Sequence, residues 1–324
     1  MKTIRESGSS ITKKMTKANI TSAFRGFFEI VKKDRALLIM LLPFFFYYIV
    51  LKYIPMYGVT IAFKDFSFGK GILGSEWVGL KYFIKFFNGY DAWKLIRNTL
   101  LISFYSLIFS FPAPIIFAIL LNELKSDKFK KITQTISYLP HFISTVIVCG
   151  MVYNFLQVDG IINILLSRGL GIKPIPFLLL SEWFRTIFIA MGTWKGFGWG
   201  AIIYLTALTG IDPQLYEAAY MDGANRFQRI IHVTIPGIVP VIVIMLILRL
   251  GDILEVSSES ILLLYNSATY ETADVISTYV YRRGLLERNY SFGAAVGFFQ
   301  SFVGLIMVLL SNKLARRYTG SGLW

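Results

Sequence analysis

The chain has 324 residues, of which 55% are hydrophobic and only 16% are charged. Soluble domains carry about 25% charged residues, so this composition excludes an ordinary soluble domain and indicates an integral membrane protein. The net charge of +14 does not favour nucleic acid binding, because many of the lysines and arginines lie in the N-terminal tail and in short loops. With one cysteine and two histidines, we expect no disulfide within the chain and no metal site.

The N-terminal tail, residues 1–35, holds nine of the 33 lysines and arginines. It lacks the apolar core and the cleavage site of a signal peptide. Residues 20–33, ITSAFRGFFEIVKK, carry apolar side chains on one helical face and charged ones on another, which predicts a short amphipathic helix. That helix either lies on the cytoplasmic membrane surface or packs on the cytoplasmic side of the same chain, and the sequence leaves both open.

Apolar runs after the tail predict the transmembrane helices, since a bilayer core of about 30 Å needs about 20 helical residues. The expected fold is all-α, with six membrane spans. The predicted spans are residues 36–63, 99–121, 132–156, 183–208, 235–254 and 292–310. Gly293 and Gly297 form a G-x3-G pattern in the last span, which favours close helix packing.

Loop charges predict the orientation, because cytoplasmic loops carry an excess of lysine and arginine. The basic N-terminal tail, the loop NELKSDKFKK and the basic C-terminal end are expected in the cytoplasm. The loop 255–291, with three arginines and five acidic residues, is expected outside. The loop 64–98 holds six lysines and arginines and departs from the rule, but the span count places it outside as well.

The predicted organisation is therefore a cytoplasmic basic tail (1–35), a transmembrane domain (36–317) and a C-terminal tail (318–324). Within the transmembrane domain, residues 209–235 form a cytoplasmic loop between the fourth and fifth spans.

That loop contains LYEAAYMDGANRFQRIIHVTIP, which is too polar to cross a bilayer. Asp212 followed by proline predicts the start of a helix that ends near Met221, and Gly223 supplies the turn after it. Asn225 and Gln228 predict a capping box that opens a second short helix, and Pro236 marks the entry to the fifth span.

The residues alone leave two interpretations of the first helix of this loop. It is either a linker between two spans or a docking surface for a soluble partner. Ala218 and Ala219 would give such a partner a shallow surface, with Glu217 and Asp222 as charges at its rim.

The pattern EAA-x3-G-x9-VTIP resembles the EAA signature of permease subunits in binding-protein-dependent ABC importers. Val233 stands where the family usually has isoleucine and Ile235 where it has leucine, and both departures are conservative. Further blocks are similar to the oligosaccharide and polysaccharide branch of that family, which includes importers of alginate-type oligosaccharides. These blocks are KYIPMYGVTIAFKDF, GLKYFIKFF, RNTLLISFYSLIFSFPAPIIFAILLNELK, QTISYLPHFIS, WKGFGWGAIIYLTALTGIDPQLYEAA and ADVISTYVYRRGL.

The resemblance implies a type I ABC importer permease in a bacterial cytoplasmic membrane, with no chemistry on its substrate. Its partners would be a second permease subunit, two ATPase subunits, an extracytoplasmic solute-binding protein and an oligosaccharide. The helix at 213–221 would be the coupling helix that seats in an ATPase. The coupling residues implied are Tyr216, Glu217, Ala218, Ala219, Met221, Asp222, Gly223, Ala224 and Pro236.

The chain contains no G-x4-G-K-[ST] phosphate loop. We therefore expect no ATPase activity and no cofactor in this chain. ATP and Mg²⁺ would be bound by the partner ATPase subunits.

Polar residues inside the spans are candidates for the substrate pathway, since an ionisable group there costs about 2.5–3.5 kcal/mol on insertion scales. Lys195 would favour an acidic sugar weakly if it lines the path, but it could equally snorkel or pair internally. Arg249 is expected to pair with Asp252, three residues on, rather than to contact sugar. The candidates are Tyr153, Asn154, Trp194, Lys195, Trp199, Tyr204 and Arg249.

Two other functional classes fit the sequence less well. A stand-alone secondary transporter of a small polar solute would need coupling-ion sites and usually an inverted repeat. Apart from Asp252, the spans hold no acidic residue, and no such repeat is evident. A membrane enzyme acting on glycans would need clustered carboxylates or metal ligands, which the spans lack.

Overall fold

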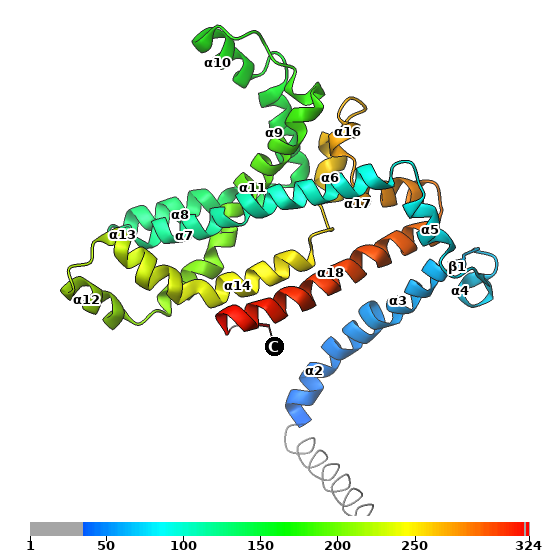
Figure 1. Cartoon of the computed structure of the whole chain (residues 1–324), viewed down its shortest axis with the longest axis horizontal. Helices are drawn as coiled ribbons and strands as arrows, with labels where there is room; N and C mark the ends of the chain where they lie inside the picture. Colours follow the sequence, from blue (N-terminus) through cyan, green and yellow to red (C-terminus); the bar gives the residue numbers. More distant parts are fainter. Residues whose placement is uncertain (1–34, 321, 324) are drawn as a thin grey trace, which may run out of the picture. The chain divides into compact units, whose positions relative to one another are not determined.

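A computed structural model describes residues 35–320 and 322–323, so the amphipathic helix predicted at 20–33 lies outside the described residues. The described part is almost entirely helical (Figure 1). Its strands β1 (Lys64–Asp65) and β2 (Glu76–Trp77) form one short antiparallel pair. The chain divides into two compact units, Met1–Thr60 and Ile61–Trp324.

The described part of the first unit is a helical run with exposed apolar side chains. It comprises α2 (Arg35–Tyr48), η1 (Ile49–Tyr53) and α3 (Ile54–Met56), and η2 (Tyr57–Phe63) continues it across the boundary. Residues Arg35–Phe63 are long and apolar enough to cross a membrane, close to the predicted span 36–63. No residue of α2, η1 or α3 is buried, which suits a helix surrounded by lipid or by another protein.

The second unit contains the helices that build the core. Its helices are α4 (Gly71–Gly74), α5 (Lys81–Phe87), α6 (Ala92–Tyr105), η3 (Ser106–Ser110), α7 (Pro112–Asn122), α8 (Asp127–Phe142), α9 (Thr145–Leu156), α10 (Ile161–Leu170), η4 (Phe177–Leu179), α11 (Ser181–Thr209), α12 (Pro213–Met221), α13 (Arg226–Arg229), η5 (Ile230–Thr234), α14 (Ile235–Gly251), α15 (Ser258–Leu264), α16 (Tyr270–Ala273), α17 (Ile276–Val280), η6 (Tyr281–Leu286) and α18 (Tyr290–Thr319).

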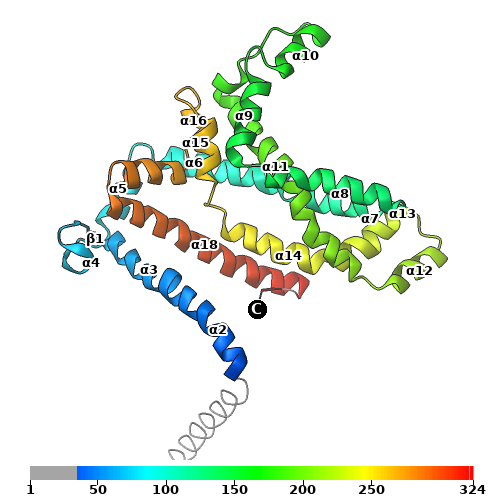
Figure 2. The same ribbon diagram turned by 180° about the vertical axis from the view of Figure 1, so that it is seen from behind.

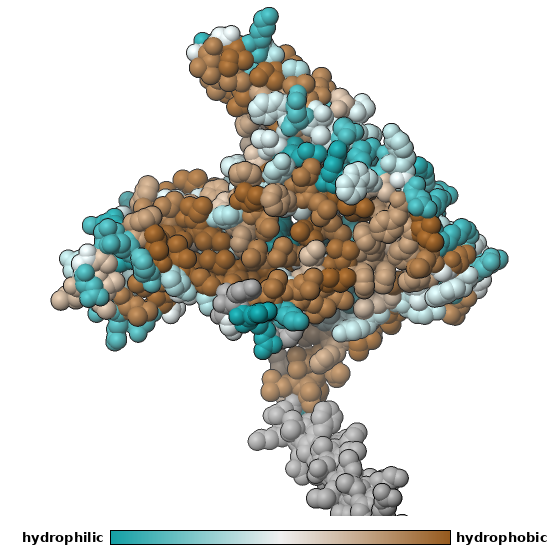
Figure 3. Space-filling model, in the orientation of Figure 1, coloured by the Kyte–Doolittle hydropathy of each residue, from teal (hydrophilic) through white to brown (hydrophobic). Residues whose placement is uncertain are grey.

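Two pairings organise this unit. Helix α11 packs along α7 and α8, and α14 runs beside α18, as Figures 1 and 2 show from opposite sides. Helices α9 and α10 extend away from these layers, and α12 lies at one end, beyond α13. Figure 3 shows a broad hydrophobic surface over the middle of this unit and polar surface near α12 and α13.

Five helical runs of the described residues are long and apolar enough to cross a membrane: Arg35–Phe63, Ala92–Asn122, Thr145–Leu170, Arg226–Gly251 and Tyr290–Arg317. The predicted fourth span lies inside α11, which has 29 residues but is not among the five. Lys195 and the glycines around it lower the hydropathy of α11. The helix is nevertheless about 43 Å long at 1.5 Å per residue.

The predicted third span, 132–156, is wrong. Helix α8 ends at Phe142 and α9 begins at Thr145, so a break divides the predicted helix. Pro140 has no N–H for the helical ladder, and the Ser144 hydroxyl accepts a hydrogen bond from the Ile147 amide as the cap of α9. The apolar run from Thr145 to Leu170 is the candidate span instead.

The second short helix predicted after Asn225 is also wrong in extent. Helices α13, η5 and α14 form one run from Arg226 to Gly251, and Pro236 lies within it.

The π-helical turns η1, η3 and η5 each end two residues before a proline, namely Pro55, Pro112 and Pro236. A proline ring clashes with the carbonyl four residues earlier, and the wider π-turn gives that carbonyl room, so the run continues through the proline.

Glycines set the two closest helix contacts. A Cβ on Gly198 of α11 would lie 2.0 Å from the Ser137 carbonyl oxygen of α8, and one on Gly304 of α18 would lie 2.4 Å from the Gly251 carbonyl oxygen of α14. Of the two glycines in the G-x3-G pattern, Gly293 packs on Gly284, whereas a Cβ on Gly297 would meet nothing within 4 Å. Close approach therefore depends on Gly198, Gly251 and Gly304 rather than on Gly297.

The α14–α18 contact gives a matched test on one helix. Gly304→Ala should destabilise the protein by about 1–3 kcal/mol, because the added methyl group overpacks against backbone. Gly297→Ala should leave stability unchanged. Thermal unfolding of the purified protein in detergent measures both, and equal melting temperatures for the two variants would contradict the predicted packing.

Candidate functional site

The loop between α11 and α14 folds as its capping residues predict. The Asp212 carboxylate accepts a hydrogen bond from the Gln214 amide at 2.9 Å, and α12 ends at Met221. Gly223 has a φ of +78°, a left-handed conformation that suits glycine. Asn225 and Gln228 form the predicted capping box, with distances of 2.8 and 3.0 Å.

Helix α12 presents its side chains outward, and none of its residues is buried. Leu215, Tyr220 and Met221 are 53%, 69% and 83% exposed. Glu217 and Ala218 are exposed as well. An exposed apolar surface with a charged rim on a short, capped helix is the kind of surface that another protein covers.

One hydrogen bond links α12 to the run that follows. The Tyr216 hydroxyl lies 3.0 Å from the Thr234 hydroxyl in η5, and Thr234 is fully buried. This contact joins α12 to the run that leads into α14. The sequence placed Tyr216 in the coupling set but did not identify Thr234 as its partner.

The predicted pathway residues do not gather in one place. Tyr153 and Asn154 are exposed on α9. Trp194 lines a cavity of about 820 Å³ together with Arg185. The Lys195 ammonium donates a hydrogen bond to the Thr145 hydroxyl at 3.0 Å. Trp199 stacks on the ring of His141, with 4.5 Å between the ring centroids. Lys195 thus has a partner inside the protein.

Arg249 and Tyr204 are brought together. They line a cavity of about 340 Å³, although Tyr204 itself is only 3% exposed. Arg249 and Asp252 also line a neighbouring cavity of about 400 Å³ among α6, η3, α11 and the end of α14. Several serines face this second cavity.

The predicted pair between Arg249 and Asp252 is wrong. The Arg249 guanidinium donates to the Ser106 hydroxyl of η3 at 2.6 Å, and the ion pairs among the described residues do not include it. Helix α14 ends at Gly251, and Asp252 has φ −93° and ψ 18° beyond that end. The two side chains therefore do not share a helical face.

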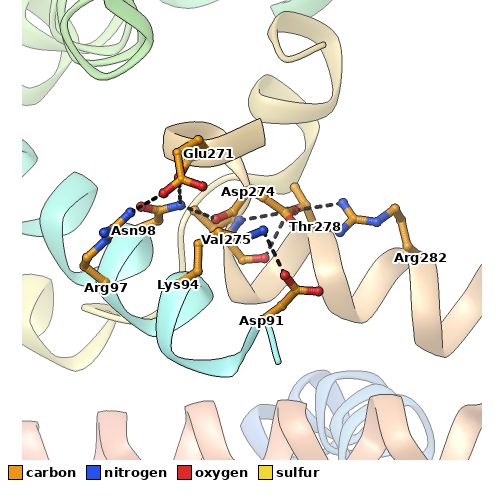
Figure 4. Close-up of polar contacts among 9 residues, drawn as sticks. All are labelled: Asp91, Lys94, Arg97, Asn98, Glu271, Asp274, Val275, Thr278 and Arg282. Carbon is orange, nitrogen blue, oxygen red and sulfur yellow. Dashed lines mark hydrogen bonds and ion pairs between the residues drawn. The ribbon is translucent and has the colours of Figure 1, made fainter. Parts of the chain in front are cut away.

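A polar junction that the sequence did not predict joins the 255–291 loop to α6 (Figure 4), and Arg185 of α11 also contacts it. Asn98 is fully buried, and its amide donates to the carbonyl oxygens of Glu271 at 2.9 Å and Asp274 at 3.0 Å. Its own side-chain oxygen accepts from Arg185 of α11 at 2.9 Å. One buried amide thus satisfies groups from three parts of the chain.

The same junction holds a buried carboxylate, Asp274, which is 3% exposed. Arg282 donates to both of its oxygens, at 2.8 and 2.7 Å, and the Thr278 hydroxyl donates at 2.7 Å. The hydrogen bonds between Arg282 and Asp274 raise the pKa of the Arg282 guanidinium above its ordinary value. Asp274 lies in extended backbone just before α17, and Thr278 and Arg282 follow it four and eight residues later. This spacing in ADVISTYVYRRGL is a signal that could have predicted the cluster.

Within residues 35–320 and 322–323, no three His, Cys, Asp or Glu side chains are grouped to hold a metal ion.

Residues 92–320 match the model of the family described as the binding-protein-dependent transport system inner membrane component. The chain belongs to this family. The matched region contains the α12 loop, the junction and all of the cavities described above, so the resemblance predicted from the EAA signature is confirmed.

Relatives of this permease are named for sugar transport. It is 46% identical to the polygalacturonan/rhamnogalacturonan transport system permease protein YteP of Bacillus subtilis, over 90% of this chain and 91% of that one. It is 28% identical to the arabinooligosaccharides transport system permease protein AraP of the same organism, over 86% and 88% of the two chains.

Solved structures give the same result. The permease is 44% identical, with a TM-score of 0.83, to a chain of a bacterial ABC transporter involved in the import of the acidic polysaccharide alginate. The match covers 90% of this chain and 99% of that one. A second structure of an alginate ABC transporter, in complex with an alginate pentasaccharide-bound periplasmic protein, matches equally well.

The two neighbouring arginines of η6 test the junction. Arg282→Ala should cost about 3–5 kcal/mol of stability, because it leaves the buried Asp274 carboxylate without its partner. Arg283→Ala should cost about 0–1 kcal/mol, since the Arg283–Glu287 pair is exposed. Thermal unfolding in detergent compares them, and a smaller loss for Arg282→Ala than for Arg283→Ala would refute the assigned role of the junction.

Proposed function

We propose that this chain is one of two permease subunits that form the translocation pathway of an ATP-driven importer for an oligosaccharide. Two ATPase subunits would bind on the cytoplasmic side, and an extracytoplasmic solute-binding protein would deliver the sugar. The observation that carries this proposal is the exposed, doubly capped helix α12 with its EAA sequence, within a chain of the binding-protein-dependent family.

An oligosaccharide substrate is supported by the relatives. Their names refer to polygalacturonan, rhamnogalacturonan and arabinooligosaccharides, and the solved neighbour was captured with a pentasaccharide-bound periplasmic protein.

The proposed topology has six spans, with both termini in the cytoplasm of a bacterium. It adds α11 to the five apolar runs, which requires its charged side chains to be satisfied inside the membrane. Lys195 donates to Thr145, and one terminal nitrogen of Arg185 donates to Asn98, whereas the buried Nε of Arg185 has no hydrogen-bond partner among the described residues.

In this proposal, the partner ATPases would drive this subunit by moving one of its helices. The chain has no phosphate loop, so ATP and Mg²⁺ would bind to the partner ATPases. In this proposal the ATPases move α12, and the hydroxyl pair of Tyr216 and Thr234 passes the movement to η5. Helix α14 continues from η5 to Gly251, where Arg249 and Asp252 line cavities. These cavities, with Tyr204, are the proposed part of the substrate pathway.

Reconstitution tests the importer against the alternative of a stand-alone secondary transporter. The chain should copurify with a second permease and the ATPases encoded with it, and the complex should hydrolyse ATP faster when sugar-loaded binding protein is added. Sugar uptake by this chain alone in liposomes, driven by an ion gradient, would contradict the proposal.

Gly223 offers a test of the coupling loop. A β-branched side chain at a φ of +78° introduces strain of roughly 1–2 kcal/mol or more, so Gly223→Val should disturb the turn that positions α12. Gly223→Asn is the control, because asparagine tolerates this conformation.

We expect Gly223→Val to insert in the membrane at wild-type levels and to lose most sugar-stimulated ATP hydrolysis in proteoliposomes. Gly223→Asn should keep most of it. Full activity of Gly223→Val would mean that the loop is only a linker.

A further inference from the structure

The chain leaves its helical form between α14 and α15, at residues 252–257. This segment lies between two cavities, of about 400 and 880 Å³, and four of its residues line both of them. Those residues are Asp252, Glu255, Val256 and Ser257. In membrane proteins, non-helical backbone at membrane depth occurs where it lines a water-filled cavity or is buried in protein.

Side chains of neighbouring helices hold this segment in place. Ser103 of α6 donates to the Ile253 carbonyl, Gln300 of α18 donates to the Leu254 carbonyl at 2.8 Å, and Ser277 of α17 donates to the Val256 carbonyl at 2.9 Å. Ser103 and Gln300 lie well inside the candidate spans Ala92–Asn122 and Tyr290–Arg317. Side chains from two candidate spans and from α17 therefore hold the break in place.

The fixed backbone leaves two carboxylates available to a ligand. Asp252 and Glu255 are exposed, and no described residue forms a side-chain hydrogen bond or ion pair with either. The 400 Å³ cavity also receives Arg249, oriented by Ser106, and the hydroxyls of Ser110 and Ser260. Its volume lies within the range of about 300–1,000 Å³ that is usual for small-molecule sites.

This lining matches the hydroxyl groups of a sugar. Carboxylates accept hydrogen bonds, a guanidinium donates them, and serines do both, so each hydroxyl of a pyranose ring can find a partner. The charge balance matters equally. Two carboxylates against one guanidinium give the lining of the cavity a net negative charge, which repels an anionic sugar.

We propose that residues 249–257 form a subsite for a neutral sugar unit and discriminate against uronates. Arg249 donates to the hydroxyls of the ring, and the carboxylates of Asp252 and Glu255 accept from them. The subsite rests on the proposed sugar-import function and specifies its substrate class. It would separate this permease from the solved neighbour, whose substrate is the acidic polysaccharide alginate. Lys195, the residue that would have favoured an acidic sugar, lines neither of these two cavities.

The test compares two probes of equal length on the full permease–ATPase complex in nanodiscs without the binding protein: cellotetraose, which is neutral, and tetragalacturonate. Equilibrium dialysis gives the affinity of each. We expect the wild type to prefer cellotetraose by roughly tenfold or more, because placing the uronate carboxylates beside Asp252 and Glu255 brings like charges together.

Glu255→Gln removes one negative charge and keeps a hydrogen-bonding group of the same shape. It should shift the preference toward tetragalacturonate by roughly tenfold. Glu259→Gln is the matched control, because Glu259 lines only the larger of the two cavities, and it should leave the preference unchanged.

A wild-type preference for tetragalacturonate, or equal shifts in the two variants, would overturn the subsite while leaving sugar import intact. Failure of the wild-type complex to bind either saccharide would overturn the subsite. If that complex also fails to hydrolyse ATP in response to a sugar-loaded binding protein, the proposed import function fails as well.

Discussion

A backbone amide or carbonyl without a partner costs several kcal/mol in hydrocarbon, and the form of this permease follows from that constraint. In most of the described chain, helices pair the backbone amides with carbonyls. Where the helix after α13 ends beside other candidate spans, side chains supply partners for the backbone: Ser103, Gln300 and Ser277 do so for the carbonyls of the 252–257 segment. Each such break therefore brings polar side chains into an apolar environment, and there the protein can bind a polar solute.

The same constraint links the two ends of α14. Its run begins at the capping box of Asn225, passes Pro236 by means of a π-turn, and ends at Gly251 beside Arg249 and the cavities. In the proposed importer, a shift at the start of this continuous run would move the cavity wall at its end. In the proposed importer, α12 and the Tyr216–Thr234 contact would provide that shift.

Local signals in the sequence predicted local structure well. Asp212, Gly223 and Asn225 act through neighbours within a few residues, and the structure reproduces the helix ends that they predict. The first, second and last spans were also predicted, because their apolar runs are long. The family was predicted from the EAA motif, which has a fixed spacing.

Features that depend on distant residues could not be predicted in this way. The break at residues 143–144 divides an apolar run that hydropathy cannot resolve. Arg249 bonds to Ser106, which is 143 positions away, and Asn98 joins groups more than 80 residues apart in the chain. Among the predicted pathway residues, Lys195 and Trp199 have partners within the protein for the same reason: tertiary contacts decide which polar side chains remain free.

The most direct test of the account is photocrosslinking from α12 in the assembled transporter. A photoreactive amino acid at Met221, which is 83% exposed, should form an adduct with the ATPase subunit. The same group at Phe155 of α9, which is 45% exposed, should not. An ATPase adduct from Met221 alone would support α12 as the coupling helix. Adducts from Phe155 but not from Met221 would contradict it.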